Sequence, residues 1–377
     1  MTEGPAFSRP AWVAVDLDAV RANIGALAGS AAPAALLATV KADAYGHGAV
    51  PVALAAVEAG AAFLGVAFVE EGIELRDAGI DAPILLLSEP PPTAAPAVIA
   101  HQLTPLVYTV HGIDALAKAV VDAGASPHAV HLKVDTGMHR VGCAPADAVA
   151  LAEMIAARDE LRLEGLATHL AVADELDSSY TDAQLDAFDA VIDAITDRVG
   201  RPAVVHAANS AGLLAHPRAR YDLVRAGIAL YGITPVDEAV ADVVLRPALS
   251  LHARVSFVKQ LDAGTRVSYG LRYTLPRASR IATVPVGYAD GVPRALGAAG
   301  GEVLVHGVRC PIAGTVTMDQ LLVDVGDLDV AVDDDVVLLG AQGDDEITAD
   351  EWAARLDTIP YEVVTRLGSR LPRRYSA

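Results

Sequence analysis

The sequence predicts an α/β protein in which an N-terminal (β/α)8 barrel of the TIM type precedes a C-terminal all-β domain. From about residue 12 to residue 232, short β-branched or Leu-rich runs alternate with Ala-rich helical stretches, as in βα units around a parallel sheet. Beyond Tyr231-Gly232 the pattern changes to alternating strands with Gly-rich turns. No Gly-rich dinucleotide fingerprint follows the first strand, where Val40-Lys41-Ala42 stands instead. These observations favour a closed barrel over an open, doubly wound sheet.

Eight barrel strands are expected, and Ala-rich helical segments separate them. The strands occupy residues 34–41, 62–68, 84–88, 103–109, 130–135, 163–169, 204–209 and 223–230. Between the sixth and seventh strands, Thr181-Asp182-Ala183-Gln184 resembles a capping box. Apolar residues then recur at helical spacing, so we expect a helix with one buried face that contains Leu185, Phe188, Ile192 and Ile195.

The change of pattern sets the expected domain limits. Residues 235–247 form a polar, acidic connection, and residues 249–258 follow as a strand. Helical runs are scarce beyond this point, apart from about residues 349–356. We therefore expect a barrel domain over residues 12–240 and a β-rich domain over residues 1–11 and 241–377.

Composition excludes several classes of protein. The 377 residues include 28 Lys plus Arg and 48 Asp plus Glu, a net charge of −20 without basic clusters, so we expect no nucleic-acid partner. A hydrophobic share of 53% excludes a disordered chain. Cys143 and Cys310 lack the spacing of a disulfide framework or a zinc site, and we expect no metal. Because signal-peptide features and long apolar runs are missing, we expect a cytoplasmic protein without membrane contact.

Polar residues gather at the predicted C-terminal ends of the barrel strands, where barrels build their sites. Lys41 follows an apolar strand, and such a lysine either acts as a neutral amine in Schiff-base chemistry or extends into solvent. The turn over residues 42–48 offers glycines and Tyr45, which suit a phosphate. The other strand ends supply residues 133–140, Thr168-His169, residues 206–210 and residues 225–232. Each alone is compatible with a salt bridge or a helix cap, whereas together they would surround one pocket.

Five motifs, in order along both domains, resemble those of the alanine racemase family. They are residues 40–48, similar to the family's cofactor-lysine motif, residues 225–232, similar to its ring-nitrogen motif, and Val267-Ser268-Tyr269-Gly270, residues 287–291 and Met318-Asp319-Gln320. The resemblance covers nearly the whole chain. It implies a pyridoxal 5′-phosphate enzyme, with a barrel and a β domain, that interconverts L-alanine and D-alanine and supplies D-alanine for peptidoglycan synthesis.

The resemblance also implies roles for individual residues. Lys41 would bind the cofactor as a Schiff base, and Arg225 would donate to its pyridine nitrogen and keep it unprotonated. Arg140 would face the cofactor phenolate and the substrate carboxylate, beside Lys133, which is carbamylated in many relatives. An unmodified Lys133 paired with Asp135 is the alternative. The remaining cofactor contacts would come from Tyr45, His169, Asn209, Ser210, Gly227, Ile228 and Tyr361.

Racemisation moves protons on both faces of a planar carbanion, so the resemblance implies two bases. Lys41 would act on the D-alanine face and Tyr269 on the L-alanine face. Tyr269 would need a cationic neighbour to ionise, and His169, which could also contact Arg225, is the candidate. In the family, residues of the second domain reach the site from the other chain of a homodimer. Here these residues would be Tyr269 and three that contact the alanine substrate: Tyr288, Met318 and Asp319.

Three alternatives stay open at this point. A barrel decarboxylase uses the same cofactor and domain plan with different motifs, and Tyr269 and Arg225 favour the racemase. A non-enzymatic cofactor-carrier barrel would lack the second domain predicted after Ala248. A serine-preferring racemase is not distinguished by composition, periodicity or spacing.

Overall fold

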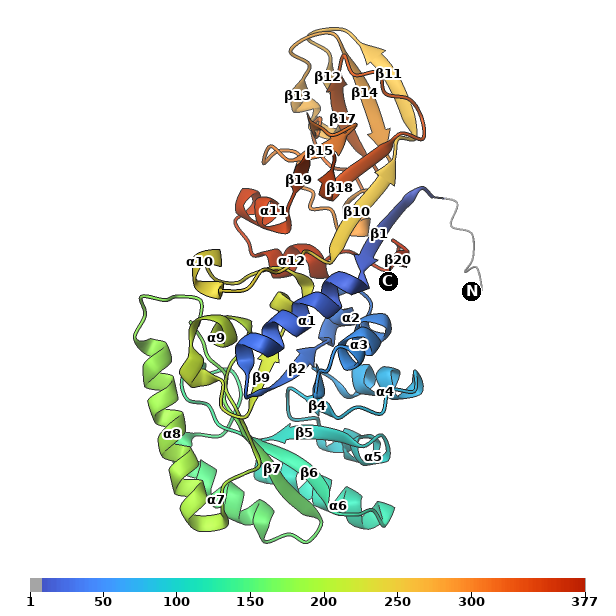
Figure 1. Cartoon of the computed structure of the whole chain (residues 1–377). Coiled ribbons are helices and arrows are strands. Elements are labelled where there is room, and N and C mark those ends of the chain that lie inside the picture. Colours follow the sequence, from blue (N-terminus) through green and yellow to red (C-terminus); the bar gives the residue numbers. More distant parts are fainter. Residues whose placement is uncertain (1–8, 377) are drawn as a thin grey trace. The chain divides into compact units, whose positions relative to one another are not determined.

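The computed structural model describes residues 9–376, without the side chains of residues 238 and 239, and it divides into two compact units (Figure 1). The barrel unit comprises residues 18–44 and 49–246. The β unit comprises the described residues before 18, residues 45–48 and the chain from residue 247. This division differs from the expected limits, because residues 12–17 and 45–48 belong to the β unit and residues 241–246 to the barrel unit.

Within the described residues, the barrel unit contains eight parallel strands in a nearly closed ring, which confirms the predicted fold class. The strand order is β8-β7-β6-β5-β4-β3-β2-β9, so β9 returns to pair with β2. Two backbone hydrogen bonds of 3.0 Å, from Asp222 to Val205 and from Arg225 to Ala208, link β9 to the β8 segment. The strands are β2 (Ala35–Thr39), β3 (Phe63–Val66), β4 (Ile84–Leu86), β5 (Leu103–Val107), β6 (His128–Lys133), β7 (Leu161–Ala167), β8 (Val204–His206) and β9 (Leu223–Ala226).

All eight predicted strands are present, and each ends earlier than predicted. The residues beyond the strand ends turn away into loops and helix starts instead of continuing the sheet. Lys41 begins α2 (Lys41–Gly46), and Asn209 is the N-cap of α9 (Ser210–Ala215). The Oδ1 atom of Asn209 accepts a 2.9 Å hydrogen bond from the amide of Gly212. Polar residues at the strand ends therefore also start the following helices.

Helices follow the barrel strands in the order expected for βα units. In α6, the Oγ1 atom of Thr109 accepts from the amide of Gly112 at 2.9 Å, and Gly124 ends the helix at a φ of 59°, which glycine adopts without strain. The helices are α1 (Leu17–Ala31), α2, α3 (Ala49–Glu58), α4 (Val69–Asp77), α5 (Ala95–Ala100), α6 (Val110–Ala123), α7 (Pro145–Ala156), α8 (Tyr180–Val199), α9 and α10 (Glu238–Ala241). Within residues 9–376, no helix has both the length and the apolar composition needed to span a membrane.

The predicted capping box at the start of α8 is wrong. The helix begins at Tyr180, and its N-cap Ser179 makes no side-chain cap hydrogen bond. Thr181 is buried, and the side chain of Gln184 instead accepts from the amide of Ala171 at 2.9 Å and donates to the carbonyl of His169 at 3.1 Å. Gln184 thus holds the loop after β7. The predicted apolar face is confirmed, since its four residues are all buried: Leu185, Phe188, Ile192 and Ile195.

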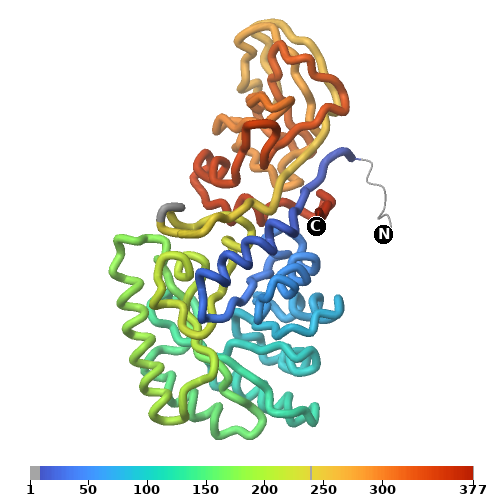
Figure 2. Tube along the Cα trace, in the orientation of Figure 1, coloured from blue at the N-terminus to red at the C-terminus, as the bar shows by residue number. Residues whose placement is uncertain are grey.

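The β unit contains three sheets among its described residues, as expected for the C-terminal β domain. The largest has the order β16-β15-β18-β10-β1-β20, with β19 paired to β18. In it, β1 (Ala11–Asp16) lies antiparallel to β10 (Leu249–Arg254) and parallel to β20 (Arg373–Ser376). Figure 2 shows the blue N-terminal segment passing close to the red C-terminal end of the chain. These pairings explain why the first strand belongs to this unit. The remaining strands of the sheet are β15 (Glu302–Val305), β16 (Val308–Pro311), β18 (Asp335–Gln342) and β19 (Asp345–Ile347).

The strand predicted over residues 249–258 is divided in two. After β10, the amide of Val255 bonds to Asp334 at 2.9 Å, whereas the amide of Ser256 bonds to Thr283 at 2.8 Å, so the chain changes sheets here. β11 (Phe257–Leu261) then joins β14 (Ser279–Val284) and β17 (Leu321–Gly326), while β12 (Arg266–Val267) and β13 (Tyr273–Thr274) form a small hairpin. The helix expected at residues 349–356 is confirmed as α11 (Ala349–Leu356). A short helix that was not predicted follows as α12 (Pro360–Thr365), because six residues are too few to show periodicity.

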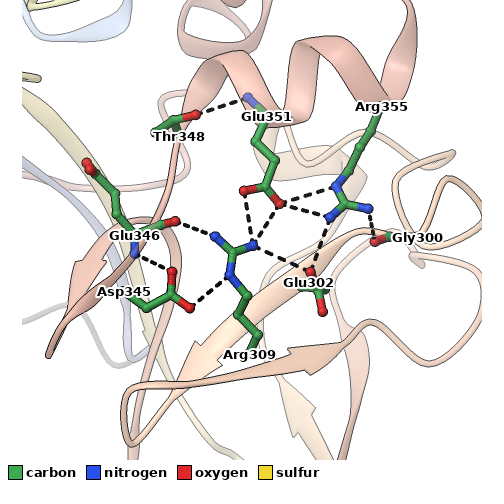
Figure 3. A network of polar contacts seen from close by, with 8 residues as sticks. All are labelled: Gly300, Glu302, Arg309, Asp345, Glu346, Thr348, Glu351 and Arg355. Carbon is green, nitrogen blue, oxygen red and sulfur yellow. Dashed lines mark hydrogen bonds and ion pairs between the residues drawn. The ribbon is translucent and has the colours of Figure 1, made fainter.

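A network of ion pairs links β16, β15 and α11 in the β unit (Figure 3). Arg309 contacts Glu351 and Asp345, both at 2.9 Å. Arg355, one turn beyond Glu351 on α11, contacts Glu351 at 3.0 Å and Glu302 at 3.1 Å. Because the side chain of Arg309 is only 30% exposed and shares a carboxylate with Arg355, we expect this network to stabilise the unit more than an isolated surface pair.

We expect Arg309→Ala to lower the free energy of unfolding by about 1–3 kcal/mol, because Asp345 loses its guanidinium partner and Glu351 keeps only Arg355. The control Arg254→Ala removes one pair with Asp335, whose side chains are 47% and 63% exposed, and should cost less than about 1 kcal/mol. Urea unfolding followed by tryptophan fluorescence measures both. If Arg309→Ala and Arg254→Ala lower the free energy of unfolding equally, the network does not stabilise the unit more than an isolated surface pair.

Candidate active site

Strand geometry gathers basic side chains inside the barrel. Successive side chains of a strand alternate between its two faces. One buried cluster takes residues from five different strands, which places those residues in the barrel interior: Leu37, Leu85, Leu106, Ala167 and Leu223. Arg225 lies two residues beyond Leu223 on β9 and therefore shares its inward face. On β6, His131 and Lys133 are likewise two residues apart and are buried together.

Arg225 is a buried cation surrounded by uncharged acceptors. It is 7% exposed and donates to the carbonyl oxygens of Thr168 at 2.9 Å and Ala207 at 2.8 Å. It also donates to the Nδ1 atoms of His206 at 2.8 Å and His169 at 3.0 Å. Burial lowers the pKa of Arg225 to about 10, so it stays charged at neutral pH. Within residues 9–376, no carboxylate forms an ion pair with it.

Two lysines add positive charge beside Arg225. Lys133 is 6% exposed, and Lys41 is half-buried. Burial, followed by the charges of Arg225 and Arg140, lowers the pKa of Lys133 to about 7, while Asp135 opposes this shift. Burial, followed by the charge of Arg140, lowers the pKa of Lys41 as well. Both amines therefore lose their proton more readily than a surface lysine, as a nucleophilic amine must.

Asp135, the carboxylate after β6, is engaged elsewhere. Its Oδ1 atom accepts from the amides of Gly137 at 3.0 Å and His139 at 2.9 Å, and its Oδ2 atom lies 3.4 Å from Nδ1 of His139. No ion pair joins Asp135 to Lys133 in the described part of the chain. A group of buried cations without a matching carboxylate suits an anionic ligand, because leaving such charges unpaired is costly.

Hydroxyl and amide groups converge near these cations. Ser210, the first residue of α9, is buried, and its Oγ atom accepts from the amides of Gly227 at 2.8 Å and Ala229 at 3.4 Å. Ile228 lies between those two residues and begins a short 3₁₀ helix, Ile228–Tyr231. The predicted phosphate residues Ser210, Gly227 and Ile228 are therefore together. Backbone amides and a hydroxyl are donors that bind phosphate oxygens.

The turn after Lys41 is left-handed, which the sequence did not indicate. The φ angles of Ala42, Asp43, Ala44 and Tyr45 are 52°, 54°, 51° and 53°. Each non-glycine residue in this conformation costs about 1–2 kcal/mol. Two carboxylates hold the turn, since Asp43 accepts from the amide of Ala49 at 2.8 Å and Glu71 accepts from the amide of Ala42 at 2.7 Å. Such stored strain is typical of functional sites.

Tyr45 and Tyr361 lie together in the β unit. Their ring centroids are 6.2 Å apart, with the rings tilted by 48°. Burial raises the pKa of Tyr45 to about 12, so its hydroxyl remains a hydrogen-bond donor at neutral pH. Tyr361 lies on α12, the helix that the sequence did not predict. The two tyrosines predicted to bind one phosphate thus neighbour each other.

The expectation that His169 is a cation beside Tyr269 is wrong. Burial and the charge of Arg225 hold the pKa values of His169 and His206 well below the usual range, so both are neutral. His169 does contact Arg225, as expected. Because an arginine only donates, the Nδ1 atom of each histidine accepts, and the proton belongs on Nε2. The sequence indicated the contact but not the charge, which depends on burial.

Three residues predicted to reach the site from the second domain lie on exposed turns of the β unit. Tyr269 is 71% exposed, Met318 52% and Tyr288 41%. The hydroxyl of Thr315 donates to the carbonyl of Tyr269 at 3.0 Å, and the amide of Tyr288 donates to Thr317 at 2.9 Å. One segment, residues 315–318, therefore holds all three turns together.

Asp319, the next residue, is linked to a buried carboxylate. Arg370 contacts Asp319 at 2.6 Å and Asp290 at 3.3 Å. The side chain of Asp290 is fully buried, contacts Arg9 at 2.9 Å and accepts from the amide of Gly287 at 2.9 Å. The motif over residues 287–291 thus has a structural function, since Asp290 holds both its own turn and the arginine that contacts Asp319.

Sequence reasoning missed His131, Glu164 and Gln184. His131 lies two residues before Lys133, and strand alternation could have placed both on the inward face. Glu164, on β7, contacts His131. Gln184 holds the carbonyl of His169, and no sequence signal reveals this contact because the two residues lie on different elements.

Comparison with known proteins gives consistent similarities over the whole chain. Residues 15–235 match the family model described as alanine racemase, N-terminal domain, and residues 248–375 match alanine racemase, C-terminal domain. An alanine racemase from Symbiobacterium thermophilum is 50% identical over 368 residues, which are 97% of each chain. A solved alanine racemase from Streptomyces lavendulae has a TM-score of 0.91 and 41% identity, covering 98% of each chain. One from Bartonella henselae, with covalently bound pyridoxal phosphate, has a TM-score of 0.86 and 31% identity over 97% of this chain and 99% of that one.

In buffer without carbon dioxide, we expect Lys133→Met to raise the free energy of unfolding at about pH 6. This gain should shrink between about pH 7 and about pH 10. The pKa of Lys133 falls from 10.5 to about 7 on folding. The unfolded chain therefore binds more protons in this window, and the cost of the buried charge is relieved as the pH rises.

The matched control is Lys118→Met, which removes a lysine whose side chain is 74% exposed. Urea unfolding across the pH range should show no comparable trend for this control. A difference between the Lys133→Met variant and the unaltered chain that stays constant with pH would rule out a depressed pKa for Lys133.

Proposed function

Because the chain belongs to the alanine racemase family, we propose that it interconverts L-alanine and D-alanine with pyridoxal 5′-phosphate bound covalently to Lys41. The observation that best supports this is the group formed by buried Arg225, buried Lys133 and half-buried Lys41, none of which is ion-paired with a carboxylate within residues 9–376. Its positive charge fits a cofactor that carries a phosphate and a phenolate. When bound, the cofactor withdraws electrons from the substrate α-carbon and so acidifies its hydrogen.

We propose that Ser210, Gly227 and Ile228 bind the phosphate, together with Tyr45 and Tyr361. The support is the 2.8 Å contact between the hydroxyl of Ser210 and the amide of Gly227, together with a Tyr45 hydroxyl that keeps its proton. Arg225 would donate to the pyridine nitrogen, and a permanently charged donor keeps that nitrogen unprotonated. His169 and Asn209 would complete the contacts around the ring.

Two bases would move the proton at the α-carbon. Lys41 would serve the D-alanine face, and its lowered pKa supports this because more of the amine is neutral. Tyr269 would serve the L-alanine face. Arg140 would bind the substrate carboxylate, with Tyr288, Met318 and Asp319 lining the substrate site.

Lys133 is proposed to carry a carbamate. Its Nζ lone pair would bond to the carbon of carbon dioxide and release one proton, which leaves an anion beside Arg140. A pKa of about 7 supports this, because the neutral amine is the reactive form. Bicarbonate should then stabilise the unaltered chain at about pH 8 but not Lys133→Met, in the unfolding experiment described above.

The second-domain residues are proposed to act across a homodimer. The exposure of Tyr269, Met318 and Tyr288 supports this, since three large side chains gathered on one surface suit a partner. Two-fold symmetry would complete both sites at once. On the sequence grounds given above, we place this dimer in the cytoplasm, where its D-alanine would supply peptidoglycan synthesis.

We expect the purified protein to convert L-alanine to D-alanine, as measured by chiral separation, and to be labelled by borohydride reduction on the peptide that contains Lys41. Serine in place of alanine should turn over more slowly, which addresses the serine-preferring alternative. Lys118 is the internal control, since an exposed lysine should stay unlabelled. Absence of D-alanine from protein with verified cofactor would refute the proposed reaction, and label on Lys133 would refute the site assignment.

We expect activity to reappear when inactive Lys41→Ala protein is mixed with inactive Tyr269→Phe protein. Each mixed dimer would contain one site with both bases intact, by the symmetry of the pair. Up to about half of the activity per mixed dimer should return. If subunits exchange and no activity returns, the two bases belong to one chain.

A further inference from the structure

A chain of hydrogen bonds crosses the barrel interior from Arg225 to Glu164. The Nη1 atom of Arg225 lies 2.8 Å from Nδ1 of His206, whose Nε2 atom lies 2.8 Å from Nδ1 of His131. The Nε2 atom of His131 lies 3.3 Å from Oε2 of Glu164. Both histidines are fully buried, whereas the side chain of Glu164 is 20% exposed. This chain of hydrogen bonds therefore joins the buried Arg225 to a partly exposed carboxylate of the barrel unit.

The direction of every hydrogen bond in this chain is fixed by the groups at its ends. Arg225 can only donate, so Nδ1 of His206 accepts and its proton must be on Nε2. That proton is donated to Nδ1 of His131, whose own proton is therefore also on Nε2. The last donor needs an acceptor, and an ionised Glu164 can only accept. One pair of neutral tautomers satisfies all four groups.

The strands around His131 leave room for its ring. A Cβ atom at Gly165 would lie 2.3 Å from Nδ1 of His131, so only glycine admits the ring there. The ladder between β6 and β7 shifts register between Val130 and His131, which places His131 opposite Gly165. The ring centroids of His131 and His206 are 5.1 Å apart and the rings are inclined by 64°, so the two imidazoles meet edge to face.

The charges at the two ends of the chain are opposite. Arg225 has no carboxylate in direct contact within the described residues, and Glu164 ends the relay that begins at its guanidinium. Glu164 also contacts Arg162 at 2.8 Å. The hydrogen bond from His131, with Arg162, lowers the pKa of Glu164 to about 2, so the carboxylate is ionised throughout the neutral range.

We propose that Glu164 is a positioning residue for Arg225, acting as the terminal acceptor that holds His131 and His206 in the Nε2–H tautomers and so fixes the guanidinium. This inference rests on the proposed function, in which Arg225 contacts the pyridine nitrogen of the cofactor. The carboxylate of Glu164 compensates the charge of the buried Arg225 guanidinium without contacting it, because the two neutral histidine rings connect them. A carboxylate in direct contact would instead compete with the cofactor for the donor groups of Arg225.

The experiment compares three variants with the unaltered holoenzyme. Glu164→Leu removes the acceptor, Glu164→Gln keeps an acceptor oxygen without the charge, and Glu153→Gln is the control, since its pair with Arg198 is on the surface with side chains 41% and 62% exposed. The first readout is the ¹⁵N spectrum of labelled histidines, assigned with His131→Asn, which reports the tautomers directly. The second is the affinity of the apoprotein for pyridoxal phosphate.

We expect His131 and His206 to show the neutral Nε2–H pattern in the unaltered chain and in Glu153→Gln. Glu164→Leu should convert His131 to a mixture of tautomers and weaken cofactor affinity about tenfold, the effect of about one buried hydrogen bond. The tautomer mixture and the cofactor affinity of Glu164→Gln should lie between those of the unaltered chain and of Glu164→Leu. This variant tests the proposal even if Glu164→Leu fails to fold.

Unchanged histidine spectra in both Glu164 variants would overturn the proposal, because loss of a merely structural ion pair with Arg162 lowers stability without altering tautomers. The spectra of the apoprotein test the chain of hydrogen bonds even if no cofactor binds. Failure of the proposed function would therefore be recognised separately from failure of this inference.

Discussion

The burial of the Arg225 guanidinium is the constraint on which the arrangement of the barrel interior depends. A cation removed from water needs a full set of acceptors, and here two backbone carbonyls and two imidazoles supply them. These acceptors come from the ends of β7 and β8, so both strands must end where their carbonyls can turn toward Arg225. Gln184, on α8, holds the carbonyl of His169 and keeps that loop in place. A helix of the outer layer thus supports a contact in the interior.

Burial, followed by the same charge, controls the protonation of the neighbouring groups. Burial and Arg225 both lower the pKa of Lys133 and of the two adjacent histidines, which favours neutral, nucleophilic or hydrogen-bonding groups where free side chains would be more often cationic. An anionic cofactor would partly relieve this concentration of positive charge. Binding of an anionic ligand would therefore raise the free energy of unfolding, whereas without such a ligand the unpaired positive charges lower it.

Local strain is concentrated beside the proposed reactive lysine. Four consecutive non-glycine residues in left-handed conformation, 42–45, are unfavourable by several times about 1–2 kcal/mol. Carboxylates of Asp43 and Glu71 cap the amides that this geometry exposes. The turn that carries Tyr269 in the β unit is similar in this respect, since Ser268 and Leu271 adopt φ angles of 60° and 49°. Hydrogen bonds hold this turn, because the hydroxyl of Thr315 donates to the carbonyl of Tyr269 and the hydroxyl of Ser268 donates to the carbonyl of Thr315.

The sequence alone determined the architecture, because strand and helix periodicity are local. Eight strands and the helix at residues 349–356 were predictable in this way, and polar residues beside several strand ends drew attention to Lys41, Lys133 and Arg225. The roles proposed for these residues came from the family resemblance of longer motifs. Tertiary structure decided what depends on contacts between distant residues. It set the charge of His169, the function of Gln184, the left-handed turn after Lys41, the change of sheet after Arg254 and the link from Arg225 to Glu164. Burial and hydrogen-bond direction arise only when separate strands meet, and no local pattern encodes them.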